Sequence, residues 1–228
     1  MIDKEFIKEN ISGFDSLAKS HGAVLCAAIK TRTNDEVDFA IRECGLKIVG
    51  ENRVQELLYH FQTIIDAGAE VHFIGHLQKN KVKYIADKVS LIESLDSIPL
   101  AEEIEKQMSK IGKKMDVLIE VNTGCEEQKS GVFPSDVPSF VSEIGKYPHI
   151  SVRGLMAVAP KCDGNDEYDK YFSLAKNIFD ELFGSDAKSK GYILSMGMSG
   201  SYLSALKHGS TEIRIGEKLF GKRENQKM

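Results

Sequence analysis

The stretch VLCAAIKTRTNDEVDFAIRECGLKIVG, residues 24–50, contains two short apolar runs, VLCAAI and KIVG, separated by a longer polar segment. Apolar runs of this length are typical of strands that are buried on both faces. Between them, Asn34 is suited to cap a helix that runs to Glu43 and stops at Gly45. Residues 24–50 therefore predict a strand–helix–strand unit.

The same alternation continues along the chain after a first helix at residues 3–20. Further strands are predicted at 71–75, 90–94, 116–122, 152–158, 192–196 and 212–216, and further helices at 54–66, 79–87, 98–111, 135–146, 167–183 and 200–208. Eight buried strands separated by helices predict an α/β fold. In 228 residues this pattern favours a single (β/α)8 TIM-type barrel with an extra N-terminal helix, over residues 1–228 with a frayed tail at 222–228. A doubly wound open sheet is the alternative.

Composition excludes several classes of protein. The formal net charge is −4, so no electrostatic attraction to nucleic acid or to an anionic membrane is expected. The longest apolar runs fall far short of a membrane span, and the N-terminal segment lacks the apolar core of a signal peptide. The four cysteines form no C-x-x-C pair and are expected to be reduced thiols, which favours the cytoplasm.

Lys30 is the first candidate for chemistry, because it directly follows the first predicted strand. Active sites of TIM barrels lie at the C-terminal ends of the strands. Apolar surroundings there would lower the pKa of the lysine and leave an uncharged amine that can form a Schiff base. The alternative is a lysine that simply extends to solvent at the strand end.

A second signal comes from the last two predicted strands. Ser199 and Gly200 lie at the start of a predicted helix, where backbone N–H groups and a hydroxyl face an anion. Gly216 follows the eighth strand and allows the backbone to approach a ligand closely. The loops after strands seven and eight often bind phosphate in such barrels. A helix-capping serine and a strand-end glycine are the alternative explanation.

Arg214 alternates with Ile213 and Ile215, so it is expected to point into the barrel. A buried arginine needs a partner, which would be a carboxylate, with Glu120 as the candidate, or a ligand. His72 and His76 are four residues apart on a strand and its exit loop, which makes them a weak candidate for a metal pair.

Several segments of the sequence resemble those of a known family. The chain resembles the pyridoxal phosphate homeostasis proteins, small proteins whose fold is similar to the N-terminal barrel of alanine racemase. The resemblance rests on AAIKTR (27–32), GENRVQE (50–56), HFIGHLQKNKVK (72–83), IEVNTG with Glu126 to Lys129 (119–129), RGLMAV (153–158), LSMGMSGSYLSAL (194–206) and STEIRIGEKLFGKRE (210–224). Two departures are Ile29, where a small polar residue is more usual, and Gly200 with Ser201, where an acidic residue is common.

The resemblance implies a role for each matching position. Lys30 would hold pyridoxal 5′-phosphate (PLP) as a Schiff base, and Arg214 would face the pyridine nitrogen. Ser199, Gly200 and the backbone around Gly216 would bind the phosphate. Asn52 and Met196 would surround the ring, and His76 is a weaker candidate.

A carrier rather than an enzyme is expected from the chemistry of Arg214. PLP stabilises carbanions best when its ring nitrogen is protonated and paired with a carboxylate, whereas an arginine can only donate hydrogen bonds. Racemisation also needs a second acid–base group, and only 12 residues follow Gly216. We therefore expect a cytoplasmic, monomeric protein that buffers PLP or delivers it transiently to PLP-dependent apoenzymes, without robust catalysis. A PLP-dependent amino-acid racemase of the same fold is the main alternative, and a cofactor-free Schiff-base aldolase is a third.

Overall fold

The strands form a closed barrel. The computed structural model describes residues 3–221, so the predicted frayed tail at 222–228 lies outside the described residues. The strands are β1 (Val24–Ala28), β2 (Ile48–Glu51), β3 (Glu70–Phe73), β4 (Leu91–Leu95), β5 (Met115–Val121), β6 (Ile150–Ala157), β7 (Ile193–Met196) and β8 (Glu212–Ile215). They pair in sequence order, every pair is parallel, and β8 closes onto β1. This closure confirms the predicted (β/α)8 barrel and excludes the open sheet.

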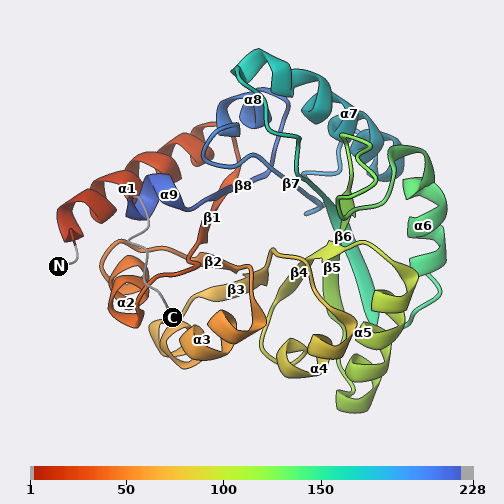
Figure 1. Cartoon of the computed structure of the whole chain (residues 1–228), viewed down its shortest axis with the longest axis horizontal. Coiled ribbons are helices and arrows are strands. Elements are labelled where there is room, and N and C mark those ends of the chain that lie inside the picture. The colour runs from red at the N-terminus through yellow and green to blue at the C-terminus, as the bar shows by residue number, and fades with distance from the viewer. Residues whose placement is uncertain (1–2, 222–228) are drawn as a thin grey trace.

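Helices surround the barrel, as Figure 1 shows. They are α1 (Lys4–Ser20), α2 (Asn34–Arg42), α3 (Val54–Ala67), α4 (Val82–Ile85), α5 (Ile98–Ile111), α6 (Val137–Ile144), α7 (Asn165–Phe183), α8 (Tyr202–Lys207) and α9 (Glu217–Phe220), with short 3-10 turns η1 (Lys79–Lys81) and η2 (Pro134–Asp136) before α4 and α6. The extra N-terminal helix is confirmed as α1, which lies beside α9. The sequence did not predict α9.

One predicted helix cap is wrong. Thr33, not Asn34, caps α2, because its Oγ1 accepts a hydrogen bond from the Glu36 N–H at 3.3 Å while Glu36 Oε2 accepts one from the Thr33 N–H at 2.8 Å. This reciprocal arrangement satisfies two N–H groups that the helix itself leaves unpaired. Asn34 is the first residue inside the helix.

The two faces of the sheet differ in polarity. Outward-facing residues, such as Ile213 and Ile215 on β8, belong to the large hydrophobic core between strands and helices. The inward residues of β8, Glu212 and Arg214, are also buried, although both are charged. TIM barrels usually fill their interior with branched apolar side chains. A polar interior is therefore the feature of this barrel that needs explaining.

Among residues 3–221, no helix combines the length and the apolar composition that crossing a membrane requires.

Candidate functional site

Lys30 lies in a turn two residues beyond the end of β1, where it is half-buried. The next residue, Thr31, has a φ of +64°. A β-branched residue is rare in this left-handed region, because its side chain crowds the backbone. The chain therefore leaves β1 through a strained turn that begins at the lysine.

Helix α3 fixes this turn from the side. Glu56 Oε2 accepts a hydrogen bond from the Thr31 N–H at 2.7 Å. One turn further along α3, His60 Nε2 donates to the Arg32 carbonyl at 2.9 Å, while its Nδ1 lies 2.6 Å from Glu51 Oε1 at the end of β2. Two residues of α3 thus hold the two residues that follow Lys30.

The His60–Glu51 pair is almost completely buried. Burial would lower the pKa of His60, but the hydrogen bond and charge of Glu51 raise it above its ordinary value. Burial raises the pKa of Glu51, against the opposing effect of His60. Since both imidazole nitrogens face acceptors, the arrangement favours the protonated imidazole.

A turn of free N–H groups follows β7. Helix α8 begins at Tyr202 with Ser201 as its cap residue, so the expectation that Ser199 and Gly200 start a helix is wrong by two residues. The turn is closed by the Ser201 Oγ, which accepts a hydrogen bond from the Met198 N–H at 3.1 Å. Among residues 3–221, neither the Ser199 nor the Gly200 N–H donates to another protein group. Two donors are thus available to an anion.

Gly216 brings the end of β8 against β1. A Cβ at this position would lie 3.0 Å from the Ala28 carbonyl oxygen, so a larger residue would push the two strand ends apart. Arg32 reinforces the contact by donating to the carbonyls of Phe220 at 3.1 Å and Gly221 at 2.8 Å. The exit of β8 is therefore fastened beside the turn that carries Lys30.

Arg214 points into the barrel, as the alternation on β8 predicts, but the predicted partner is wrong. Its guanidinium donates to Ser195 Oγ at 2.5 Å and to the Ala157 carbonyl at 3.0 Å, and it lies 3.6 Å from Glu93 Oε2. Glu120 forms no ion pair with it; burial, with the charge of Asp96, raises the pKa of Glu120 to about 7. The prediction that Glu120 points inward was correct, but the residues that contact Arg214 are Glu93 on β4 and Ser195 on β7.

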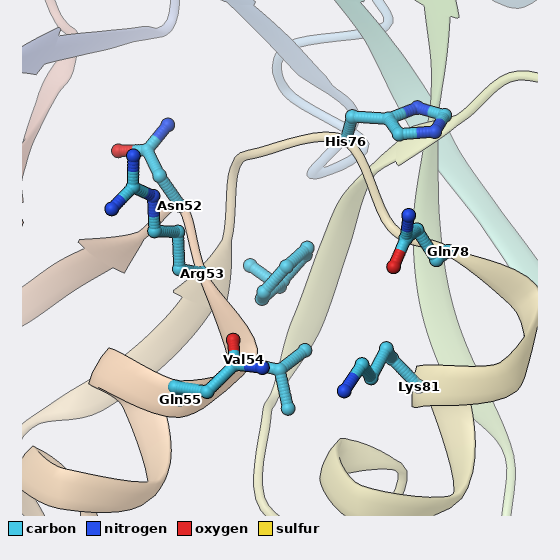
Figure 2. A pocket seen from close by; sticks show the side chains of 8 residues that line it. Asn52, Arg53, Val54, Gln55, His76, Gln78 and Lys81 are labelled. Carbon is cyan, nitrogen blue, oxygen red and sulfur yellow. The ribbon is translucent and has the colours of Figure 1, made fainter.

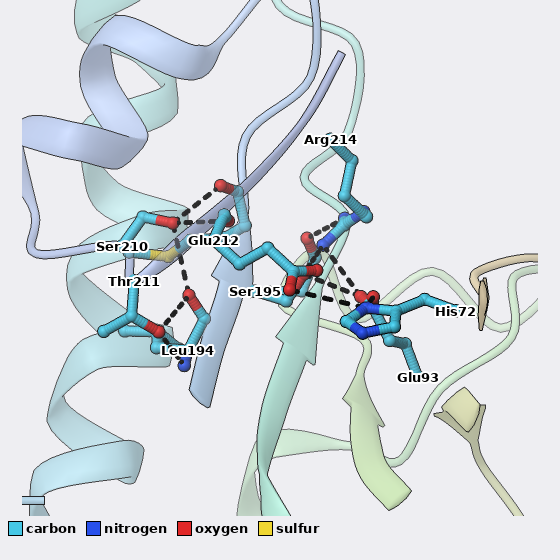
Figure 3. Close-up of polar contacts among 10 residues, drawn as sticks. His72, Glu93, Leu194, Ser195, Ser210, Thr211, Glu212 and Arg214 are labelled. Atoms are coloured by element: carbon cyan, nitrogen blue, oxygen red, sulfur yellow. Dashed lines mark hydrogen bonds and ion pairs between the residues drawn. The ribbon is translucent and has the colours of Figure 1, made fainter. Parts of the chain in front are cut away.

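Ser195 joins the arginine to a deeper polar cluster (Figure 3). Its Oγ lies 2.7 Å from Glu93 Oε2 and 3.1 Å from Glu212 Oε1. His72 Nδ1 in turn lies 3.0 Å from Glu93 and 3.4 Å from Glu212. Two buried carboxylates are therefore matched by one guanidinium and one imidazole.

The pKa values of the cluster follow from these contacts. Burial would raise the pKa of Glu93, but His72 and Arg214 lower it to about 2. Burial and the charge of Glu93 raise the pKa of Glu212 to about 7. Burial would lower the pKa of His72, but Glu212 raises it well above its ordinary value. The Cys26 thiol completes the cluster, and burial raises its pKa to about 12.

Side-chain atoms of Cys26, His72, Glu93 and Glu212 lie within 4.8 Å of one another, and all four are residue types that ligate metal ions. Both carboxylates, however, already face hydrogen-bond partners, and the cluster balances its charge without an ion. His76 is not part of this group: it is 59% exposed on the rim, 3.5 Å from Asp96. His72 and His76 therefore do not form a metal pair.

The remaining two predicted residues have different environments. Asn52 is half-buried in the loop after β2, and its Oδ1 is buried with no hydrogen-bond partner among residues 3–221. Met196 is fully buried in the hydrophobic core, on the strand face opposite the inward-pointing Ser195. The expectation that the Met196 side chain lines the site is therefore wrong, because strand alternation directs it toward the helices.

Sequence reasoning missed Glu56 and Glu93, and it did not connect Ser195 with Arg214. Glu93 and Ser195 stand inside predicted strands, in SLIES and YILSM, so the alternation that predicted the orientation of Arg214 also applied to them. Glu56 lies on a helix and gives no such signal.

The site presents an amine, a set of free N–H donors and a buried guanidinium at strand ends that adjoin in the barrel, β7, β8 and β1. Free N–H groups suit a phosphate, and the unpartnered Asn52 oxygen suits a hydroxyl donor. A phosphorylated aldehyde with a ring hydroxyl, such as PLP, therefore fits the residues present.

Comparisons with known proteins give the family. The family described as the alanine racemase N-terminal domain matches residues 2–224. A pyridoxal phosphate homeostasis protein of Aquifex aeolicus is 43% identical over 202 residues, which are 89% of this chain and 88% of that protein. Its counterpart in Pasteurella multocida is 32% identical over 225 residues, which are 97% and 96% of the two chains.

Solved structures agree with this result. PipY of Synechococcus elongatus, solved with PLP bound, is 27% identical and superposes with a TM-score of 0.78 over 94% of this chain and all of that one. Alanine racemase of Corynebacterium glutamicum, at 16% identity and a TM-score of 0.75, shares the fold over 64% of its own length. The chain therefore belongs to the family of pyridoxal phosphate homeostasis proteins, built on the alanine racemase N-terminal barrel.

Proposed function

We propose that this protein binds PLP as a reversible Schiff base on Lys30 and serves its storage and delivery. The observation that carries the proposal is the convergence of Lys30, the free N–H groups of Ser199 and Gly200, and Gly216 on adjoining strand ends. PipY, a relative of the same family fold, was solved with PLP bound. The protein would act as a single barrel domain over residues 1–228.

Each residue would make one contribution. Lys30 supplies the amine, and Glu56 and His60 hold the turn in which that amine is presented. The N–H groups of Ser199 and Gly200, with the backbone at Gly216, bind the phosphate. Asn52 Oδ1 accepts a hydrogen bond from the ring hydroxyl.

Arg214 separates a carrier from an enzyme in this proposal. PLP, when bound, supplies an electron sink whose strength depends on a protonated ring nitrogen. Arg214 can only donate, and Ser195, Ala157 and Glu93 hold its charge in place. A guanidinium facing the ring nitrogen favours its unprotonated form, so the sink is weak. We therefore propose reversible binding without robust catalysis.

The four cysteines are free thiols, as expected of a chain that stays in the reducing cytoplasm. PLP-dependent apoenzymes are the proposed transient recipients, and a monomer is the proposed form.

Absorption spectroscopy tests this function. Wild-type protein mixed with PLP should develop the near-visible band of a protein-bound Schiff base, and Lys30→Ala should not. Lys47→Ala is a matched control, because Lys47 is exposed next to the start of β2, away from the strand exits. A band that persists in Lys30→Ala would contradict the proposal. Robust conversion of L-amino acids into their D-forms would show that the protein is a racemase and not a carrier.

A further inference from the structure

A separate pocket lies between the exits of β2 and β3. It has a volume of about 290 Å³ and is formed by the first residues of α3, the loop after β3 and η1 (Figure 2). A volume near 300 Å³ suits a small ligand. Of the residues considered above for PLP it contains Asn52 and the weaker candidate His76, whereas Lys30, Ser199, Gly200, Arg214 and Gly216 do not line it.

The charged groups of this β2–β3 pocket have one sign. Arg53 and Lys81 are its cations, His76 and the amides of Gln55 and Gln78 line it beside them, and no carboxylate does. Each of these side chains offers at least one hydrogen-bond donor. The lining is therefore suited to an anion.

Neighbouring acids neutralise these cations only in part. Arg53 lies 3.4 Å from Glu56, but that carboxylate already accepts the Thr31 N–H. Lys81 has no carboxylate within 4 Å in the described part of the chain; its amine lies 5.8 Å from the Tyr84 ring.

The backbone adds to the same positive potential. Helix α3 has 14 residues and begins in this pocket at Val54, and its cap residue Arg53 forms no side-chain cap hydrogen bond. A helix start carries partial positive charge, so the cations beside it add to the attraction for an anion, and Glu56 in the first turn of α3 offsets that potential only in part. Figure 2 shows the Lys81 side chain extending toward Val54.

We infer that the β2–β3 pocket binds the oxyanion of a small molecule, a carboxylate or a phosphate, beside the site proposed for PLP. The oxyanion would lie between the start of α3 and Lys81, with the amides of Gln55 and Gln78 as further donors. The β2–β3 pocket does not include Lys30. The inference therefore does not depend on whether PLP forms a Schiff base at Lys30.

Titration by NMR tests the inference. The ¹⁵N-labelled full chain is titrated at constant ionic strength with inorganic phosphate and, separately, with succinate. We expect saturable shifts of the Gln55 and Gln78 side-chain amides, with affinity at least about fivefold weaker in Lys81→Ala. Lys83→Ala is the matched control, because it removes the same charge from the neighbouring exposed position on α4 without lining the pocket. If phosphate binds more tightly than succinate, the natural ligand is a phosphate; if succinate binds more tightly, it is a carboxylate.

Two results would overturn the inference. One is an absence of saturable shifts at Gln55 and Gln78 with either anion; the other is equal affinity in wild type, Lys81→Ala and Lys83→Ala, which indicates non-specific screening. A repeat in Lys30→Ala separates this site from the PLP site. Shifts that persist there support an independent site, and shifts that vanish assign the anion to the PLP site and contradict the inference.

Discussion

At the scale of single residues, the turn after β1 stores backbone strain where the reactive amine is proposed. Thr31 is one of two non-glycine residues with positive φ in the described chain, the other being Cys125. Such conformations cost on the order of 1–3 kcal/mol and persist only where surrounding contacts enforce them. Here the enforcing contact is the hydrogen bond from the Thr31 N–H to Glu56. Glu56 is therefore a positioning residue for Lys30.

We expect Glu56→Ala to weaken PLP binding and to lower the free energy of unfolding by about 1–2 kcal/mol, because the Thr31 N–H loses a charged acceptor. Glu56→Gln retains an acceptor oxygen and should restore most of the PLP affinity. Fluorescence or absorbance titration measures the affinity, and urea denaturation the stability. Equal PLP affinity in wild type and Glu56→Ala would show that this hydrogen bond does not position the lysine.

Arg214 and Glu93 should depend on each other for stability. Arg214→Leu removes one of the two positively charged partners of the buried Glu93 and leaves only His72, which is expected to cost about 3–5 kcal/mol. Glu93→Gln in the same chain removes that charge, so the double variant should be more stable than Arg214→Leu alone. Urea denaturation of the four members of this cycle measures the coupling. Additive losses would show that the two charges act independently.

At the scale of elements, the strands were predictable because each is a short apolar run between helical segments. Their bounds agree with the prediction to within two residues. Helix α9 was not predictable in this way, since four residues, Glu217–Phe220, are too few to show a helical period. The cap of α2 did have a signal, the T-x-x-E spacing of Thr33 and Glu36, but Asn34 suits the same role.

The site was predictable where the information lies within one strand. Alternation along β8 correctly turned Arg214 inward. It could not select Glu93 over Glu120 as the nearest acid, because that choice depends on the stagger of strands across the closed barrel. The contact of Glu56 with the turn after β1 is likewise tertiary, between residues 25 apart in the chain.

The inward faces of β4, β7 and β8 make stability depend on pH. Folded Glu212 has a pKa of about 7, raised by burial and by Glu93 from an ordinary value of 4.5. Between these values the folded chain keeps a proton that the unfolded chain has released, so the free energy of unfolding should fall as pH rises from 4.5 to 7.

Glu212→Gln should reduce this fall in the free energy of unfolding by about 1–3 kcal/mol, because the group that binds the proton is removed. Urea denaturation at several pH values between these limits measures the slope. Glu70→Gln, at the exposed first residue of β3, should leave the slope of the wild type unchanged. If the free energy of unfolding falls equally steeply with pH in Glu212→Gln and in wild type, a group other than Glu212 has the raised pKa.

At the scale of the whole molecule, barrel closure places the exits of the first and last strands side by side. Residues 30–32 follow the first strand and Gly216 follows the last, yet Arg32 reaches the carbonyls of Phe220 and Gly221. The N–H groups of Ser199 and Gly200 lie in the turn that follows β7, the strand next to β8. This shared rim is the proposed PLP site, with Lys30 as the amine that holds the cofactor.

Borohydride reduction followed by peptide mass spectrometry tests this Schiff base, because reduction makes it permanent at the lysine that formed it. We expect one phosphopyridoxyl group per chain, on the peptide that contains Lys30. Label spread over exposed lysines such as Lys47, or no label at all, would contradict it.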